Sequence, residues 1–312
     1  MILGVPPARL ADRWRHLSDS GLAWVAAYPA AVTTAERTTA LIEVDCAPGA
    51  VHTVAARLEI DQRVVTIEHV APRKDLLLTV MTRTLDDLSE LMLDELPGIK
   101  GIVSTQTHLA AHMYFEGSRW RLDALDSDQL TALEQISWHA SSPSTVLASP
   151  ALTPGVVSLA RALSRDGRAS AADLAATTDR PSSTVRRQLS ALLASGSLTF
   201  RCDIAQPVTR WPLLAYFWCQ APDLQRDELL NLLRRNANVR LCLSLLGPTN
   251  FVVALWSESL TKIQATQIKL EECMPSVQVT DVSVALRARK RMGWLLRPDG
   301  RATGEVIPVA AL

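Results

Sequence analysis

The stretch "DRPSSTVRRQLSALLASGSL", from Asp179 to Leu198, has the pattern of a short helix with two different faces. A proline followed by serines favours a helix start, and Ser-Gly at its far end favours a stop. Leucines recur behind the arginines at helical spacing, so that face is expected to pack inward. The residues predicted to face outward on its front half are Ser182, Ser183, Thr184, Arg186, Arg187 and Gln188.

A related stretch, "GVPPARLADRWRHLSDSGL", occupies Gly4 to Leu22. Aligning Gly21 with Gly196, an offset of 175, superposes the prolines and the apolar positions of the two stretches. The same order of elements then follows each stretch: strand, helix, two strands, helix, strand, which is the ferredoxin-like βαββαβ order. The predicted ranges are 40–44, 50–60, 64–70, 76–82, 85–96 and 101–115, then 213–220, 226–236, 240–246, 251–257, 260–274 and 277–287. The chain is therefore interpreted as a tandem repeat of one structural unit.

Two further helices, near 155–164 and 170–177, are predicted in front of the 179–198 stretch. Three short helices in this order are typical of a helix-turn-helix, whose last helix enters the DNA major groove. Residues 161–187 carry six arginines and three aspartates within a chain of zero net charge. "SLTFRCDIAQP" behind the third helix is expected to form a wing. A solvated arginine face on an ordinary helix is the alternative interpretation.

The predicted fold class is α+β, with winged helix-turn-helix and ferredoxin-like βαββαβ domains in tandem duplication. The predicted domains are 1–36 (remnant of a first winged helix-turn-helix), 37–124 (first βαββαβ), 125–153 (Ser- and Pro-rich linker), 154–210 (second winged helix-turn-helix) and 211–312 (second βαββαβ with a C-terminal extension). In the remnant, Arg9 and Arg13 keep a basic face. Without supporting helices, we expect this helix to bind DNA poorly or to pack on a neighbour. The basic run 287–301 is interpreted as a solvated extension.

Composition and the absence of several motifs exclude further classes of protein. The five cysteines are scattered without a CxxC pair, which is typical of a reduced compartment. Neither a signal pattern nor an apolar span long enough for a bilayer is found in the sequence. We therefore expect a cytoplasmic protein without membrane contact. No nucleotide-binding or hydrolase motif is found, and no cofactor or metal is expected. His108 and His112 fall in a β-like run, where four residues span roughly 13 Å, too far for one metal ion.

On "DGRASAADLAATTDRPSSTVRRQLSALLASGSL" (166–198) and the βαββαβ unit behind it, the chain resembles the Lrp/AsnC (feast/famine) transcription regulators in a tandem form. The resemblance implies DNA reading by the winged helix-turn-helix, pairing of the βαββαβ domains, and an amino acid or similar effector at their interfaces. The family's effector turn falls on "APRKD" (71–75) and "GPTN" (247–250), and its fourth strand on "STQT" (104–107) and "QVTD" (278–281). The implied effector-binding residues are Asp75, Thr105, Thr107, Gly247 and Asn250. Both turns also fit a plain hairpin connection.

The sequence thus predicts a sequence-specific DNA-binding transcriptional regulator and not an enzyme. Its expected partners are double-stranded DNA, a small effector and itself, as a pseudo-dimer within the chain that associates further. Two alternatives stay open. The sirohaem decarboxylases share this layout and act on a tetrapyrrole in an interfacial pocket with His and Arg, and the first repeat contains His69, His108 and His112. The other alternative is a sensing or assembly module without DNA binding.

Overall fold

The computed structural model describes residues 3–30, 37–119, 125–140, 154–222 and 226–310. The chain divides into two compact units. We call the first the helical unit (Met1–Thr33 and Arg121–Asp203, with Leu312) and the second the barrel unit (Thr34–Trp120 and Ile204–Ala311). Each unit is described by itself below.

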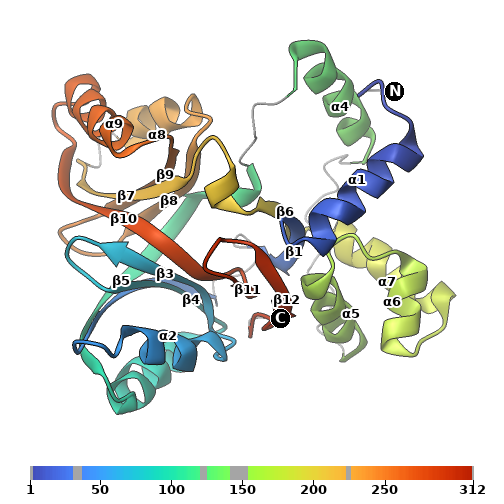
Figure 1. Cartoon of the computed structure of the whole chain (residues 1–312), viewed down its shortest axis with the longest axis horizontal. Coiled ribbons are helices and arrows are strands. Elements are labelled where there is room, and N and C mark those ends of the chain that lie inside the picture. Colours follow the sequence, from blue (N-terminus) through green and yellow to red (C-terminus); the bar gives the residue numbers. More distant parts are fainter. Residues whose placement is uncertain (1–2, 31–36, 120–124, 141–153, 223–225, 311–312) are drawn as a thin grey trace. The chain divides into compact units, whose positions relative to one another are not determined.

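The barrel unit contains both βαββαβ repeats. The elements of the first repeat are β2 (Thr38–Cys46), α2 (Val51–Glu59), β3 (Val64–Ala71), β4 (Leu76–Thr82), α3 (Leu85–Glu90), which continues through a π-helical turn (Leu91–Glu95), and β5 (Ile102–Phe115). Those of the second are β7 (Leu213–Gln220), α8 (Arg226–Arg234), β8 (Val239–Leu245), β9 (Phe251–Ser257), α9 (Leu260–Cys273) and β10 (Gln278–Arg291). The predicted α+β fold with tandem ferredoxin-like domains is confirmed (Figure 1).

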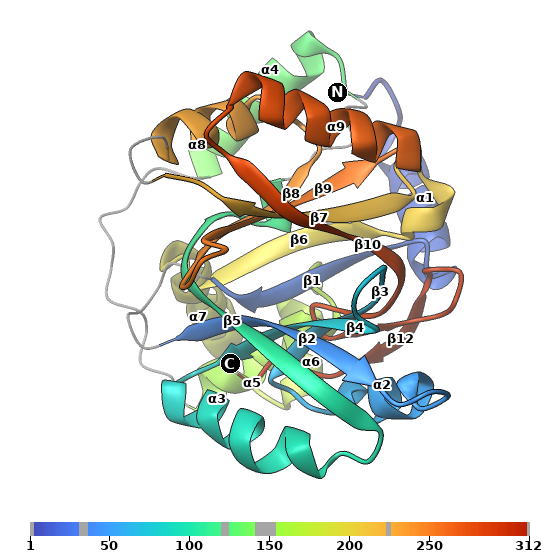
Figure 2. The same ribbon diagram turned by 90° about the vertical axis from the view of Figure 1, so that its left-hand side faces the viewer.

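The eight repeat strands close into an antiparallel barrel in the order β10-β3-β4-β2-β5-β8-β9-β7, with β7 pairing back to β10. The last strand of each repeat, β5 or β10, is long and pairs with the second strand of the other repeat (Figure 2). The first such seam pairs Ala110 with Leu245, His112 with Ser244, Met113 with Leu243 and Phe115 with Cys242. The second pairs Ala285 with Val70, Arg287 with His69, Ala288 with Glu68 and Lys290 with Ile67. Each of these four pairs of the second seam corresponds to a pair of the first by the predicted offset of 175 (110 becomes 285, and 70 becomes 245), and the second seam has one further pair, Val284 with Ala71.

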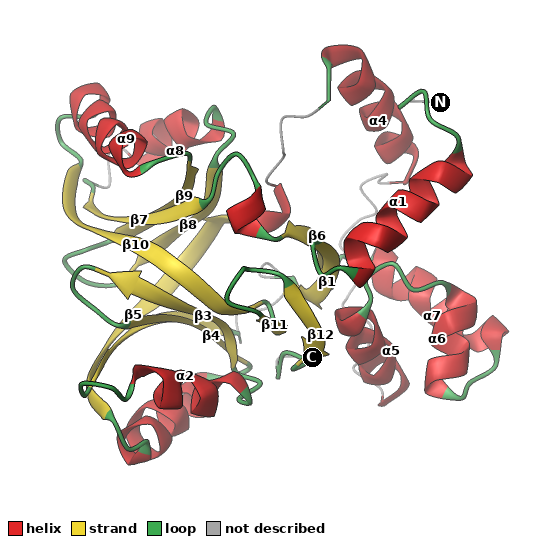
Figure 3. Cartoon of the chain, in the orientation of Figure 1, coloured by secondary structure: helices red, strands yellow, loops and turns green. Residues whose placement is uncertain are grey.

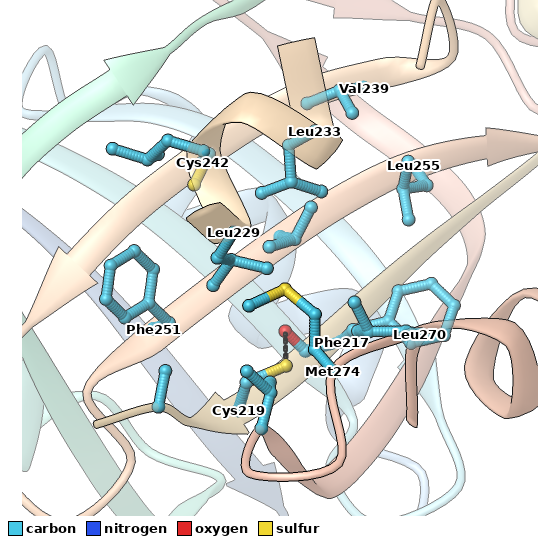
Figure 4. Close-up of a cluster of buried hydrophobic side chains, with 14 of the residues drawn as sticks. Phe217, Cys219, Leu229, Leu233, Val239, Cys242, Phe251, Leu255, Leu270 and Met274 are labelled. Carbon is cyan, nitrogen blue, oxygen red and sulfur yellow. Dashed lines mark hydrogen bonds between the residues drawn. The ribbon is translucent and has the colours of Figure 1, made fainter. Parts of the chain in front are cut away.

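Helices cover the outside of the barrel wall (Figure 3). Under α2 and α3 lies a buried aliphatic cluster of the first repeat that includes Ile42, Leu58 and Leu78. Under α8 and α9 lies its counterpart in the second repeat, with Phe217, Leu229 and other side chains of Figure 4. The alternate residues of the same strands point inward and form a third cluster inside the barrel. Burial of each large apolar side chain stabilises this arrangement by about 1.5–3 kcal/mol.

The two seams differ in chemistry at equivalent positions. Phe115 packs into the helix-side cluster of the second repeat. Its equivalent, Lys290, is fully buried, and its Nζ donates hydrogen bonds of 2.8 Å to the carbonyl oxygens of Glu59 and Asp61. These carbonyls lie at the end of α2, where a helix leaves its last carbonyls without partners. The lysine of the second repeat therefore caps a helix of the first.

The C-terminal segment corrects one prediction. Residues after β10 form β11 (Trp294–Leu296) and β12 (Ala302–Val306), which extend the sheet beyond β10. Trp294, Leu296 and Val306 are buried, and Lys290 and Arg291 are buried as well. The run 287–301 is therefore part of the fold and not a solvated extension. Apolar and cationic side chains of this run are thus buried together.

The helical unit contains α5 (Pro154–Arg165), α6 (Ala171–Thr178) and α7 (Ser182–Ala194). Their shared core includes Leu159, Leu163, Leu174, Val185 and Leu192. A capping box, in which Ser170 and Asp173 satisfy each other's backbone amides, begins α6. Asp179 in the left-handed conformation (φ 50°) ends it and turns the chain toward α7.

The wing strand β6 (Leu198–Ile204) follows α7 and pairs with β1 (Ala23–Pro29). β1 belongs to the first repeat and follows α1 (Pro7–Asp19), in which no residue is buried. Arg168 of the second repeat stacks 4.5 Å from the ring of Trp14 on α1. The segment of α1 and β1 thus packs on the segment of the second repeat that holds α5 to β6.

Within the segment predicted as a linker, residues 127–140 form α4 (Ser127–Ala140). Residues 141–153 of that segment lie outside the described residues. Among the helices described, none is long and apolar enough to cross a membrane.

Candidate ligand pocket and recognition helix

The front of α7 presents the polar residues singled out in the sequence. Ser182, Ser183, Arg186 and Arg187 are exposed, whereas Val185 is fully buried against α5 and α6. In the described part of the chain, the two arginines have no ion-pair partner. Four polar side chains, two of them cationic, are therefore free to contact another molecule. Thr184 is half-buried on the same turn.

Gln188, assigned to DNA from the sequence, is occupied inside the helical unit. Its Oε1 accepts a hydrogen bond of 2.5 Å from Nη2 of Arg180, whose Nη1 donates to the carbonyl of Gly155 at 2.9 Å. Arg180 in the turn thus joins the start of α5 to α7, a role that spacing in the sequence does not reveal. Arg9 and Arg13 of α1 are exposed.

A second candidate site is a pocket of about 380 Å³ in the barrel unit. Its lining residues are Glu43, Arg73, Lys74, Gln106, His108, Trp218, Thr249, Thr280 and Asp281. Each of the four segments that the family resemblance marks (71–75, 104–107, 247–250 and 278–281) contributes at least one of them. The fold therefore brings together four segments that are far apart in the sequence.

The five residues predicted to bind an effector do not themselves line this pocket. Asp75 accepts a hydrogen bond of 2.7 Å from the backbone amide of Cys46, and Asn250 exchanges two hydrogen bonds with the backbone of Ala221. Gly247 lies in its turn with φ 120°. Thr107 contacts the sulfur of Met92 on the helix side of β5, and Thr105 is exposed.

Strand alternation explains this displacement by one residue. Thr105 and Thr107 share the face of β5 that is opposite to Gln106 and His108, and the latter two reach the pocket. The resemblance located the segments, while the pleat of the strand selects which of their side chains line the cavity.

Glu43, His108 and Trp218 form the inner part of the pocket. Glu43 Oε2 lies 3.0 Å from His108 Nε2, and both side chains are about nine-tenths buried. The His108 ring packs 4.6 Å from that of Trp218, whose Nε1 donates to Ser283 Oγ at 3.2 Å. A carboxylate and an imidazole in hydrogen-bond contact can share a proton and can accept or donate toward a ligand.

The rim supplies positive charge from the 71–75 turn. Lys74 Nζ lies 2.7 Å from Asp45 Oδ2, which also accepts from Ser104 Oγ at 2.5 Å. These two hydrogen bonds lower the pKa of Asp45 below its ordinary value. Arg73 is 68% exposed, and its Nε lies 3.9 Å from Asp281 Oδ2, beyond hydrogen-bond distance. The pocket therefore has one anchored and one loosely held cation.

The other histidines considered in the sequence lie elsewhere. His69 packs edge-on against His52 at 5.3 Å, and His112 packs on Tyr114 at 4.5 Å. Burial lowers the pKa of His69, with His52 and two arginines contributing. Among the described residues, no group of three or more His, Cys, Asp or Glu side chains is arranged to hold a metal ion.

Comparison with known proteins agrees with this architecture. Residues 39–120 match the sequence profile of the Lrp/AsnC ligand-binding domain. Across the whole chain, the fold is similar to the siroheme decarboxylase NirDL in co-complex with an iron-uroporphyrin III analogue (TM-score 0.52, 13% identity, 92% of this chain and 84% of that chain). A second NirDL structure gives the same values. At this identity the likeness concerns the fold.

Shorter regulator structures align with part of the chain. LrpC of B. subtilis covers 43% of this chain and 94% of its own at 15% identity (TM-score 0.39). The regulator NMB0573 from Neisseria meningitidis, in complex with L-Met, covers 43% of this chain and 88% of its own at 17% identity (TM-score 0.39). A comparison with curated proteins gives no match. The profile match and the structural match over 92% of the chain show that the fold corresponds to tandem Lrp/AsnC-like ligand-binding domains.

Proposed function

We propose that the chain is a DNA-binding transcriptional regulator whose barrel pocket binds a small organic acid such as an amino acid. The observation that carries the proposal is the exposed front of α7, where Ser182, Ser183, Arg186 and Arg187 face away from a packed three-helix core. A helix-turn-helix inserts the corresponding end of its last helix into the major groove. Short hydroxyls approach base edges or phosphates there, and arginines contact guanine edges or the backbone.

The pocket supplies the regulatory half of the proposal. Arg73 and Lys74 complement a carboxylate, and Glu43 and Asp281 accept hydrogen bonds from amino or hydroxyl groups. A ligand that binds one conformation of the protein better than another shifts the population toward it. We expect such a shift to change DNA affinity.

The test is DNA binding by the full chain. A selection from genomic fragments supplies the DNA, and fluorescence anisotropy measures its affinity at several salt concentrations. R186A/R187A should weaken binding at least tenfold and reduce the slope of log affinity against log salt by about 2, because each phosphate contact contributes about 1. R234A/R235A, an adjacent pair of exposed arginines on and just after α8, is the matched control. Equal affinities of both double variants would overturn the assignment of α7.

A second candidate is an enzyme acting on a tetrapyrrole. The whole-chain fold likeness to NirDL favours it, as does the hydrogen-bonded His108 and Glu43 pair beside two cations. The pocket volume of about 380 Å³ lies at the lower end of the range for ligand sites, which favours a smaller molecule. Incubation with sirohaem separates the candidates. An altered absorption spectrum with carbon dioxide release, lost in H108A, would establish the enzyme, and an unchanged spectrum would exclude it.

A further inference from the structure

The lining of the barrel pocket contains pairs of equivalent positions from the two repeats. Residues 175 apart occupy the same place in each repeat, as the two seams show. Three such pairs line the pocket with both of their members: Glu43 and Trp218, Lys74 and Thr249, and Gln106 and Asp281. A cavity reached by the same position of both repeats lies on the approximate two-fold axis that relates them.

Two identical repeats would give such a pocket two identical halves, as in an isologous dimer. In this chain the members of each pair differ chemically. A carboxylate (Glu43) corresponds to an indole (Trp218), and an ammonium group (Lys74) corresponds to a hydroxyl (Thr249). The duplication within one chain has therefore given an on-axis pocket two unlike sides.

The positive charge lies on one side only. Arg73 and Lys74 belong to the 71–75 turn of the first repeat, and the positions equivalent to them are Pro248 and Thr249, which are uncharged. Lys74 Nζ uses one of its three donors on Asp45, which leaves two for a ligand. Arg73 is held by Asp281 only at 3.9 Å, so its guanidinium can turn to an anion.

We propose that the pocket takes one small organic acid per chain in a single orientation. The anionic group lies at Arg73 and Lys74, and the hydrogen-bond-donating end lies toward Thr249 and Asp281 of the second repeat. The inference rests on the ligand-binding half of the proposed function and is independent of DNA binding. A pocket with two equivalent halves would accept such a ligand in either direction.

Calorimetric titration of the full chain tests stoichiometry and charge together. The probes are the twenty L-amino acids and their carboxamides, in which the carboxylate is replaced by a neutral amide. At least one amino acid should bind with one site per chain, and its carboxamide at least tenfold more weakly, because a charge-assisted hydrogen bond is lost. Two sites per chain, equal binding of the carboxamide, or no binding of any amino acid would overturn the inference. These measurements need no variant.

An exchange of equivalent residues tests the axis itself. K74T should weaken the bound amino acid at least tenfold, and K74T/T249K, which moves the ammonium group to the equivalent place on the other side, should regain most of that loss. K262T, at an exposed position of α9, is the control for removing a lysine. A folded exchange variant that binds as weakly as K74T would contradict the on-axis site. DNA affinity measured on the same samples separates this outcome from failure of the regulator proposal.

Discussion

Lys290→Met is expected to change how the stability of the barrel unit depends on pH. Burial lowers the pKa of Lys290 from 10.5 to about 8, although Asp61 and Glu59 act in the opposite direction. A lowered lysine pKa means that the unfolded chain binds the proton more tightly than the folded chain, so the free energy of unfolding rises with pH. The full effect corresponds to about 3 kcal/mol and accumulates between pH 8 and pH 10.5.

Between pH 7 and pH 9, the wild type should gain about 1 kcal/mol relative to Lys290→Met. Urea unfolding at pH 7 and at pH 9, monitored by tryptophan fluorescence, measures the difference in free energy of unfolding between the wild type and Lys290→Met at each pH. Other groups that titrate in this range are common to both proteins and cancel. Lys262→Met, in an exposed position, should follow the wild type. A wild-type advantage that stays constant or falls from pH 7 to pH 9 would refute the argument that the folded chain disfavours this ammonium group.

The other predictions concern the helical unit. Gly155→Ala places a Cβ atom 2.8 Å from Nη2 of Arg180, so the guanidinium must leave the position in which it joins α5 to α7. We expect weaker DNA binding, measured by anisotropy. Unchanged affinity would contradict this role of Arg180. Ser170→Ala removes the N-cap of α6 and should cost about 1 kcal/mol in thermal unfolding of this unit. Leu159→Ala, at a fully buried position, should cost about 2–5 kcal/mol by the same measurement, and a loss below that of Ser170→Ala would contradict its place in the core.

The order of elements could be predicted because each repeat carries its own periodicity. Apolar spacing predicts α2, α9 and the strands between them, and the offset of 175 relates the two repeats. Long-range pairing could not be predicted in the same way. β1 is a short apolar run that pairs with β6, some 170 residues later. Nothing in the sequence of either strand indicates this pairing. The closure of β10 on β3 is equally remote in sequence.

The candidate pocket was predicted at the level of segments. Gln106 stands between two predicted residues of β5, where a shift of one position moves a side chain to the other face of the strand. Lys74 stands beside the predicted Asp75 in the turn before β4. The role of Lys290 could not be predicted from the sequence for a different reason. In the run "RARKR" it has the appearance of a solvated charge, and the carbonyl oxygens that accept its hydrogen bonds belong to the last residue of α2 and to Asp61 just after it, about 230 residues earlier.

Closure of the barrel also limits the strand edges at which another molecule could add a strand. Each of the eight barrel strands has a neighbouring strand on both sides, although β5 pairs with β2 through Ile102–Leu109 and with β8 through Ala110–Phe115. In the described part of the chain, the sheet that includes this wall ends at β12, a five-residue strand interrupted by Gly304. Short, irregular borders of this kind resist the addition of strands from other molecules. Addition of a strand from another molecule at β12 is therefore disfavoured.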